Sequence, residues 1–432
     1  MHSWCSPFLL TTDNFGATTN VWRLDQGDPQ PTLLHPSLPP TRHAATTTTV
    51  HIVSPNERFL AIALSSHTSA SWRIYDLSTG SLISESDFPQ TQSHSLGRWQ
   101  NAGDLAALTV EQGGKQVILR YKLTDEGQLE QRGCAIATPE DPARTDSFEL
   151  QHLAKDGSIF TYASDIPSKH PLGIAYYPPY SDRTTFPARL ALPFTSEEKD
   201  TIVAKNFIQV SENSLAFSVE ENEWGADMNP IAALSTVRLV TYTTCTTPND
   251  KPHMTLSWTI RLEHAVEEIA YVPTLGTGTI VVQGRWHAPY AGDGSRGPDK
   301  RVLTFLDPST GALLKQTEQT VVPKGASLQC IGPNWVVYNK LAQTPWLYVI
   351  PLTRVMEIGL DGVENSGGQM DAQVKKVEVR NGPEPWNSKA KKAAEQGRWR
   401  WVNDAELLPD GKLVVFPERG PEFWVLDPTM ID

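Results

Sequence analysis

The chain has 432 residues, of which 39% are hydrophobic and 20% are charged, and its net charge at pH 7 is −12. This composition is that of a folded globular protein and excludes an intrinsically disordered one. The acidic balance argues against general binding to duplex DNA, because that affinity comes largely from lysine and arginine contacts to phosphates.

The cysteines, the N-terminal segment and the longest apolar runs bear on where the protein is located. Four cysteines lie far apart and form no Cys-x-x-Cys pair, which argues against a disulfide scaffold and a structural zinc site. The opening MHSWCSPFLLTT has no lysine or arginine, so we expect no signal peptide. No apolar run reaches the about 18 residues that a membrane span needs. We therefore expect a cytoplasmic or nuclear location.

Short strand-like segments with apolar residues at every second position fill the chain, and turns rich in Pro, Gly, Asn and Asp separate them. One signal recurs, in which a strand ends in Asp and a Thr-Gly turn leads into the next strand. It occurs as IYDLSTGSLI (74–83) and as TFLDPSTGALL (304–314), and in degraded form as RYKLTDEGQL (120–129). The Asp side chain can cap the turn, and the Gly supplies the positive φ angle that closes a hairpin.

A second signal, an Asn/Asp/Gly turn, lies upstream in each unit. Examples are SPNERFLAI (54–62) and AKDGSIFTY (154–162). Together the two signals predict units of four antiparallel strands. We place six of them at 46–90, 93–136, 145–194, 200–263, 265–320 and 325–381, with three more strands near each end of the chain, around Phe8, Val21 and Leu33 and around Asp404, Leu413 and Phe423.

Repeated four-stranded meanders predict an all-β fold, a single β-propeller of seven or eight four-stranded blades that covers 1–432. We expect the two termini to close the ring, and one short helix in an insertion near the C-terminus. The pattern resembles the WD40-like propellers over nearly the whole chain. The resemblance is one of architecture, carried by strand ends at Tyr75-Asp76, Leu306-Asp307 and Leu426-Asp427, and the Gly-His dipeptide of regular repeats is absent.

Four insertions interrupt the repeat at 28–41, 220–230, 285–301 and 359–401. Such loops are better functional candidates than the blades, because a rigid scaffold presents them. The first, rich in proline, is interpreted as a docking segment or a surface connection. The second is interpreted as an acidic loop that binds a basic partner, or as a solvated face, with candidate residues Glu221, Glu223, Trp224 and Asp227.

The third insertion, 285–301, is interpreted as a flexible hairpin loop or as a contact surface made by Arg285, Trp286, His287 and Tyr290. Its glycines and aspartates only faintly resemble a calcium loop, because the spacing and the terminal Glu of an EF-hand are missing.

The fourth insertion is expected to be disordered in its first half and to hold a short helix over 387–397 in its second half. Lys391, Lys392, Arg398 and Arg400 make this second half basic among tryptophans. That mixture indicates binding to RNA, single-stranded DNA or an acidic protein. Alternatively, the tryptophans pack the helix against the propeller.

The standard catalytic and nucleotide-binding motifs are absent from the sequence. Propeller enzymes gather carboxylates or histidines from several blades at the mouth of a central channel. Residues near blade entries are Glu149, His152, Glu267, Glu268, Asp404 and Glu406. The sequence gives no reason to choose among them, so we predict no catalytic residue, metal ligand or cofactor, and we interpret His264 and His287 as structural.

The leading hypothesis is a non-enzymatic interaction scaffold or substrate-recognition subunit of a larger complex, because the resembled architecture commonly serves that role. Its partners would be other proteins. One alternative is a propeller hydrolase or lactonase with a metal ion in the central channel. Another is a subunit of an RNA-associated complex that uses the basic segment at 386–401.

Overall fold

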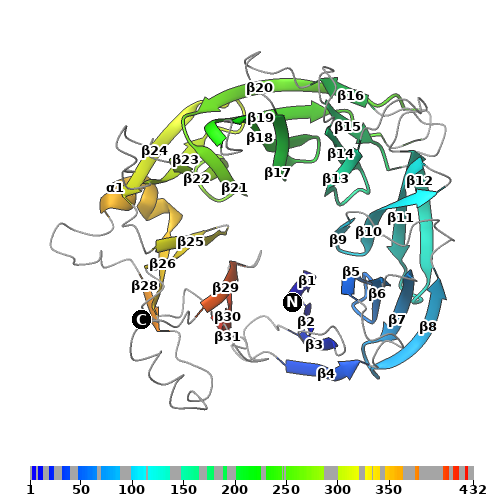
Figure 1. The fold of residues 1–432 in the computed structure, drawn as a ribbon. Helices are drawn as coiled ribbons and strands as arrows, with labels where there is room; N and C mark the ends of the chain where they lie inside the picture. The colour runs from blue at the N-terminus through cyan, green and yellow to red at the C-terminus, as the bar shows by residue number, and fades with distance from the viewer. Residues whose placement is uncertain are drawn as a thin grey trace. The chain divides into compact units, whose positions relative to one another are not determined.

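The described residues of the protein, in a computed structural model, form strands, turns and one helix (Figure 1). The described residues are 2–5, 8–12, 19–23, 32–38, 47–65, 70–87, 99–112, 115–136, 147–164, 173–179, 188–191, 201–224, 230–245, 247, 250–286, 300–320, 326–332, 334–340, 346–362, 375–378, 402–407, 412–417 and 424–426.

The strands of the N-terminal half form antiparallel meanders in chain order. The first sheet contains β1 (His2–Cys5), β2 (Phe8–Thr12), β3 (Thr19–Arg23) and β4 (Thr32–Leu38). The second contains β5 (Thr47–Val53), β6 (Phe59–Ser65), β7 (Ala70–Asp76) and β8 (Ser81–Asp87). The third contains β9 (Trp99–Ala102), β10 (Leu105–Gln112), β11 (Lys115–Leu123) and β12 (Leu129–Ile136), and the fourth β13 (Ser147–Leu153), β14 (Ile159–Ser164), β15 (Gly173–Tyr177) and β16 (Ala188–Ala191).

The same meander continues to the C-terminus. The fifth sheet contains β17 (Thr201–Ser211), β18 (Ser214–Trp224), β19 (Pro230–Tyr242) and β20 (Met254–Leu262). The sixth contains β21 (Ala265–Val272), β22 (Thr279–Trp286), β23 (Lys300–Leu306) and β24 (Leu313–Thr320). The seventh contains β25 (Ala326–Ile331), β26 (Trp335–Lys340), β27 (Trp346–Pro351) and β28 (Lys375–Glu378), and the last β29 (Val402–Leu407), β30 (Leu413–Pro417) and β31 (Trp424–Leu426).

The eight sheets formed by the described strands confirm the six predicted units and the strands predicted at both ends. Closure of a ring by the termini stays a prediction. Two compact units can be distinguished, one made of 1–203, 211–214 and 240–256, the other of 204–210, 215–239 and 257–432.

The middle strands are apolar on both faces. In β6, Leu60 and Ile62 pack into one cluster with the β1–β4 sheet, whereas Ala61 and Ala63 pack into another with the β9–β12 sheet. In the second unit, Val282 of β22 likewise faces the β17–β20 sheet while its neighbours in sequence face the β25–β28 sheet. These two sheets therefore bury both apolar faces against neighbouring sheets, which stabilises them by roughly 25 cal/mol per Å² of apolar surface removed from water.

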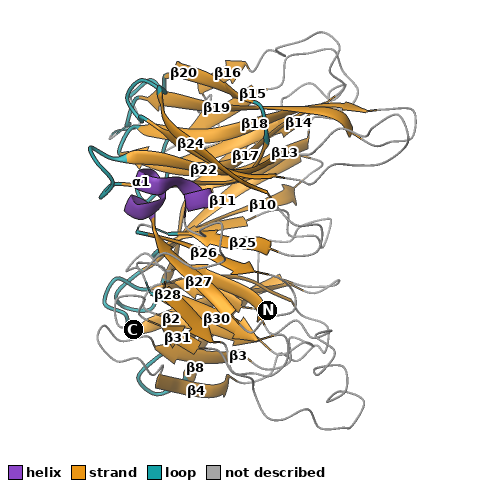
Figure 2. Cartoon of the chain, turned by 90° about the vertical axis from the view of Figure 1, so that its left-hand side faces the viewer, coloured by secondary structure: helices purple, strands orange, loops and turns teal. Residues whose placement is uncertain are grey.

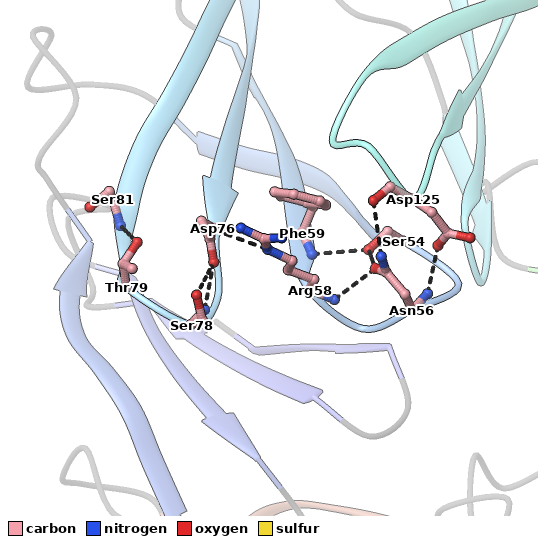
Figure 3. A network of polar contacts seen from close by, with 9 residues as sticks. All are labelled: Ser54, Asn56, Arg58, Phe59, Asp76, Ser78, Thr79, Ser81 and Asp125. Carbon is pink, nitrogen blue, oxygen red and sulfur yellow. Dashed lines mark hydrogen bonds and ion pairs between the residues drawn. The ribbon is translucent and has the colours of Figure 1, made fainter.

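The turns are closed by side chains, as the repeated Asp-x-Ser-Thr-Gly signal predicts. At the end of β7, Asp76 accepts hydrogen bonds from the Ser78 backbone N–H at 2.8 Å and from Arg58 Nη2 at 3.0 Å (Figure 3). After β23, Asp307 accepts bonds from the backbone N–H groups of Ser309 and Thr310 at 2.8 and 2.9 Å. These hydrogen bonds lower the pKa of both aspartates, because they favour the charged carboxylate.

Turns of neighbouring sheets also bind one another. Asn56, in the turn before β6, donates its backbone N–H to Asp125 Oδ1 at 2.8 Å and its side-chain amide to the Asp125 carbonyl at 2.9 Å (Figure 3). Asp125 belongs to the β11–β12 turn. The turn residues thus set the spacing between the two sheets as well as the hairpins within them.

Glycines in these turns adopt positive φ angles and also leave room for an aromatic side chain of the neighbouring sheet. Gly311 has φ +72°, and an added Cβ would lie 2.6 Å from the ring of Trp258 in β20. The Trp258 indole N–H donates to the Pro308 carbonyl of the same turn at 3.0 Å. Gly127 lies in the same way against Phe59.

The helix of the described residues is α1 (Leu352–Gly362), directly after β27 (purple in Figure 2). Its apolar residues Leu352, Val355 and Leu360 are buried in the cluster between the β21–β24 and β25–β28 sheets. Gly359, with φ 81°, interrupts the helical backbone.

Side chains of β24 satisfy the backbone of α1. Lys315 Nζ donates to the carbonyls of Met356 and Glu357, the latter at 3.1 Å. The Leu360 N–H donates to Thr317 Oγ1 at 2.7 Å. A cation at the carbonyl end of a helical segment also interacts favourably with the helix dipole.

The structure corrects two expectations about the first and fourth insertions. Residues 32–38 of the first insertion form β4, the edge strand of the sheet that the described residues build, and proline is tolerated at sheet edges. Residues 360–362, expected to be disordered, belong to α1 because Leu360 is buried in the core. The helix predicted at 387–397 lies outside the described residues.

The two roles of Gly311 can be separated by substitution. Gly276 has φ +63° with nothing within 4 Å of an added Cβ, so Gly276→Ala is expected to cost only the backbone strain, about 1 kcal/mol. Gly311→Ala adds overpacking against Trp258 and should cost about 1–3 kcal/mol more. Chemical denaturation of both variants checks this order, and equal losses would show that the Trp258 contact is not tight.

Candidate functional site

A charged cluster lies at the end of the β21–β24 sheet where β21 and β23 begin and β22 ends. The strand register places Arg285 directly opposite Arg301, and Trp286 opposite Lys300. Two arginines in directly opposite positions repel one another unless carboxylates lie nearby. The cluster therefore needs an anionic group at this position.

Glu267 supplies that group through a β-bulge. The pairing of β21 with β22 shifts between Val266 and Glu268, so Glu267 is the extra residue, and bulges commonly re-aim a side chain. Glu267 Oε1 lies 3.1 Å from Arg285 Nε, and its Oε2 accepts a hydrogen bond from Gln283 Nε2 at 3.2 Å. Arg285 and Glu267 are each about one-third exposed, at 34% and 35% of their side-chain surface.

Glu268 lies deeper, opposite Gln283 in the strand register. Burial raises the pKa of its carboxyl to about 7, a hydrogen bond from the Ile331 backbone opposes this shift, and the neighbouring Glu267 charge adds to it. A carboxyl with such a pKa can hold or release a proton near neutral pH, which makes Glu268 a candidate functional group.

Trp286 and Lys300 form a second contact at the same strand ends. Lys300 Nζ lies 5.5 Å from the centre of the Trp286 ring and donates to Glu318 Oε2 at 2.8 Å. A cation above an indole ring is attracted by its negative face. An aromatic ring and a cation therefore meet at these strand ends, on the face of the sheet opposite to Arg285 and Arg301.

His264 precedes β21 and is buried. Its Nδ1 lies 3.2 Å from the Ala265 carbonyl, and its Nε2 lies 3.0 Å from Thr304 Oγ1 in β23. Burial lowers the pKa of the ring, which keeps it neutral. Gly284 leaves room for it, because an added Cβ would lie 2.0 Å from Nδ1. This arrangement agrees with the structural role expected for His264.

Of the residues predicted for the third insertion, the structure places Arg285 and Trp286 in strand β22 and brings them to the cluster. The expectation of a loop over 285–301 is wrong at its ends, because 285–286 and 300–301 pair as strands. His287 and Tyr290 lie outside the described residues.

The acidic loop expected at 220–230 is also wrong over 220–224, which belongs to strand β18. The charge of Glu220 is accommodated because it pairs with Lys205 of the adjacent strand β17. Glu221, Glu223 and Trp224 lie in β18, and their side chains, like Asp227, lie outside what the structure describes.

The basic segment with Lys391, Lys392, Arg398 and Arg400 falls outside the described residues, so its role in RNA or protein binding stays a prediction. In the described part of the chain, no three His, Cys, Asp or Glu side chains gather in a group that could hold a metal ion. No helix there is long and apolar enough to cross a membrane.

Sequence reasoning missed Gln283, Lys300 and Arg301. Arg301 is buried at 3% exposure, and Gln283 at 5%. The sequence signal for this cluster is that basic residues stand at both ends of the insertion 285–301. A hairpin brings these two ends together.

The raised pKa of Glu268 gives a pH dependence with a defined sign. Its pKa is about 7 in the folded chain against an ordinary value of 4.5, so the folded state is penalised once the carboxyl ionises. Stability should fall as the pH rises from about 4.5 to 7, by up to about 3 kcal/mol at one pKa unit per 1.4 kcal/mol.

Glu268→Gln should remove this fall and make the protein more stable than wild type at pH 8. Denaturation curves from pH 4.5 to 8 measure the effect, with Glu263→Gln at an exposed neighbouring position as the control. A wild type and a Glu268→Gln variant with parallel pH profiles would rule out the buried, neutral carboxyl.

No protein-family model matches the chain, and no curated protein matches it. Among solved structures, the chain is similar to the propeller of Dos1, with 11% identity, a TM-score of 0.48 and coverage of 98% of this chain and 89% of that one. The C-terminal WD40 domain of Sif2 gives 11% identity, a TM-score of 0.45 and coverages of 98% and 94%.

The dihydro-heme d1 dehydrogenase NirN is similar at 12% identity and a TM-score of 0.45, with coverages of 98% and 75%. Scores at this level carry no information on activity or partners, so the fold assignment rests on the chain's own sheets. These are four-stranded antiparallel meanders in chain order, with Asp-capped turns after third strands. In architecture, the chain is an all-β protein of repeated antiparallel meanders, as predicted for a β-propeller.

Proposed function

We propose that the chain is a non-enzymatic scaffold for protein–protein interaction, and that one partner binds at the strand ends that carry Arg285, Trp286 and Lys300. The observation that supports this proposal is the Trp286–Lys300 contact at the same strand ends as the Arg285–Glu267 ion pair, on the opposite face of the sheet. Tryptophan and arginine are the residue types that most often dominate the energy of protein interfaces.

The position of these side chains also supports a binding role. They stand on paired strands, where Arg285 and Lys300 are fixed by ion pairs with Glu267 and Glu318. A group held on a rigid element loses little conformational entropy when a partner binds. Lys300 and Glu318 remain 41% and 44% exposed, as expected for charges at the rim of an interface.

The test is affinity capture of the tagged chain from its cell of origin, with quantitative mass spectrometry. Trp286→Ala should reduce the amount of a stoichiometric partner by about thirtyfold, which corresponds to a hot-spot loss of roughly 2 kcal/mol. Arg285→Ala should act in the same direction. Arg132→Ala, which removes an exposed arginine paired with Glu130 in β12, should leave capture unchanged.

Thermal unfolding of each variant checks that the fold is intact. The proposal would be contradicted if the wild-type chain captured no stoichiometric partner. It would also be contradicted if partners remained bound to both the Trp286 and the Arg285 variants.

A further inference from the structure

The carboxylate of Glu267 contacts two groups of its own chain, through an ion pair with Arg285 and a hydrogen bond from Gln283. One oxygen lies beside the Arg285 guanidinium and the other accepts from the Gln283 amide. The two donors come from alternate positions of β22, on one face of the sheet, so their spacing is set by the strand. This arrangement forms a site for one planar carboxylate.

The charges around this site favour an additional anion. Arg285 and Arg301 are both permanently charged, since guanidinium groups do not lose their proton in proteins. Glu267 balances one of them, and Glu268, whose pKa burial raises to about 7, is only partly ionised at neutral pH. Arg301, directly opposite Arg285 and buried, strengthens the positive potential behind the site.

An incoming carboxylate can displace Glu267 more easily than it can displace Gln283. It is the extra residue of a bulge and is partly exposed, whereas Gln283 is buried. Gln283 Oε1 has no hydrogen-bond partner among the residues that the structure describes. A backbone N–H that accompanies an incoming carboxylate would satisfy this oxygen.

We propose that Arg285 and Gln283 bind an aspartate or glutamate side chain of an acidic protein segment, and that Glu267 occupies this position in the free chain until the partner displaces it. This inference rests on the proposed scaffold function and gives the chemistry of its partner. Arginine suits the role because its fork of N–H groups matches the two oxygens of a carboxylate.

A nucleic acid fits the site less well. The chain carries a net charge of −12, and Glu267 and Glu268 lie in the strand next to Arg285, so a polyanion with many phosphates meets repulsion around the one favourable position. The position now holds a single carboxylate, which is the group that one acidic side chain offers.

The test uses two fluorescein-labelled peptides, (Gly-Glu)4 and (Gly-Gln)4, and fluorescence anisotropy with the full chain. The wild type should bind the Glu peptide and not the Gln peptide. Glu267→Gln removes the internal competitor and should tighten Glu-peptide binding about three- to fivefold, the effect of an ion pair of roughly 0.6–1 kcal/mol. Arg285→Gln should weaken binding at least about tenfold.

Two controls separate displacement from a general change of charge. Glu85→Gln removes the carboxylate that pairs with Arg73 in another sheet and should leave binding unchanged. In the double variant Glu267→Gln/Arg285→Gln, the gain from the first substitution should disappear, because the two residues act on one site. A gain that persists without Arg285 overturns the proposal.

Further outcomes would overturn it as well. Equal binding of the Glu and Gln peptides would contradict carboxylate recognition, and so would tighter binding of an octauridylate or of a phosphoserine version of the peptide. The scaffold proposal is tested separately: a partner whose capture depends on Trp286, in a chain that binds no Glu peptide, would leave the scaffold standing and remove only its acidic ligand.

Discussion

The sheets that contain β6 and β22 have two apolar faces to bury, and neighbouring sheets cover them. A strand in the middle of a meander, such as β6 or β22, sends alternate apolar side chains to the sheets before and after it. Such a sheet would not be stable alone, because both of its apolar faces would be exposed to water. The repeated unit is therefore stable only as one member of a series.

The turns adjust the spacing of that series. An aspartate that caps its own turn, a glycine that lets an aromatic ring of the previous sheet approach, and the Asn56–Asp125 bonds all act at the same ends of the strands. The sequence therefore keeps these turns more regular than the strands between them. Towards the opposite ends, the first strands of several sheets share a one-residue bulge, and in the β21–β24 sheet this bulge lies beside a set of charges.

The units could be placed from the sequence because the turn motifs that separate their strands are local. Asp76 and Asp307 bond only residues two or three positions ahead, so the motif is readable without the fold. The charged cluster was not predictable, because it depends on strand register. A bulge of one residue decides that Glu267 meets Arg285, and pairing across a long insertion brings Arg301 opposite Arg285. Helix α1 was missed because it is short and broken at Gly359, and tertiary packing together with Lys315 stabilises it.

Native-state hydrogen exchange tests the central claim, that burial between neighbouring sheets stabilises each unit. The hydrogen-bonded amides of β6 and β22, whose side chains are covered on both faces, should exchange far more slowly than those of β8 and β24 at the sheet edges, where Leu82 and Leu313 are exposed. Equal protection of middle and edge strands, or stronger protection at the edges, would contradict this account.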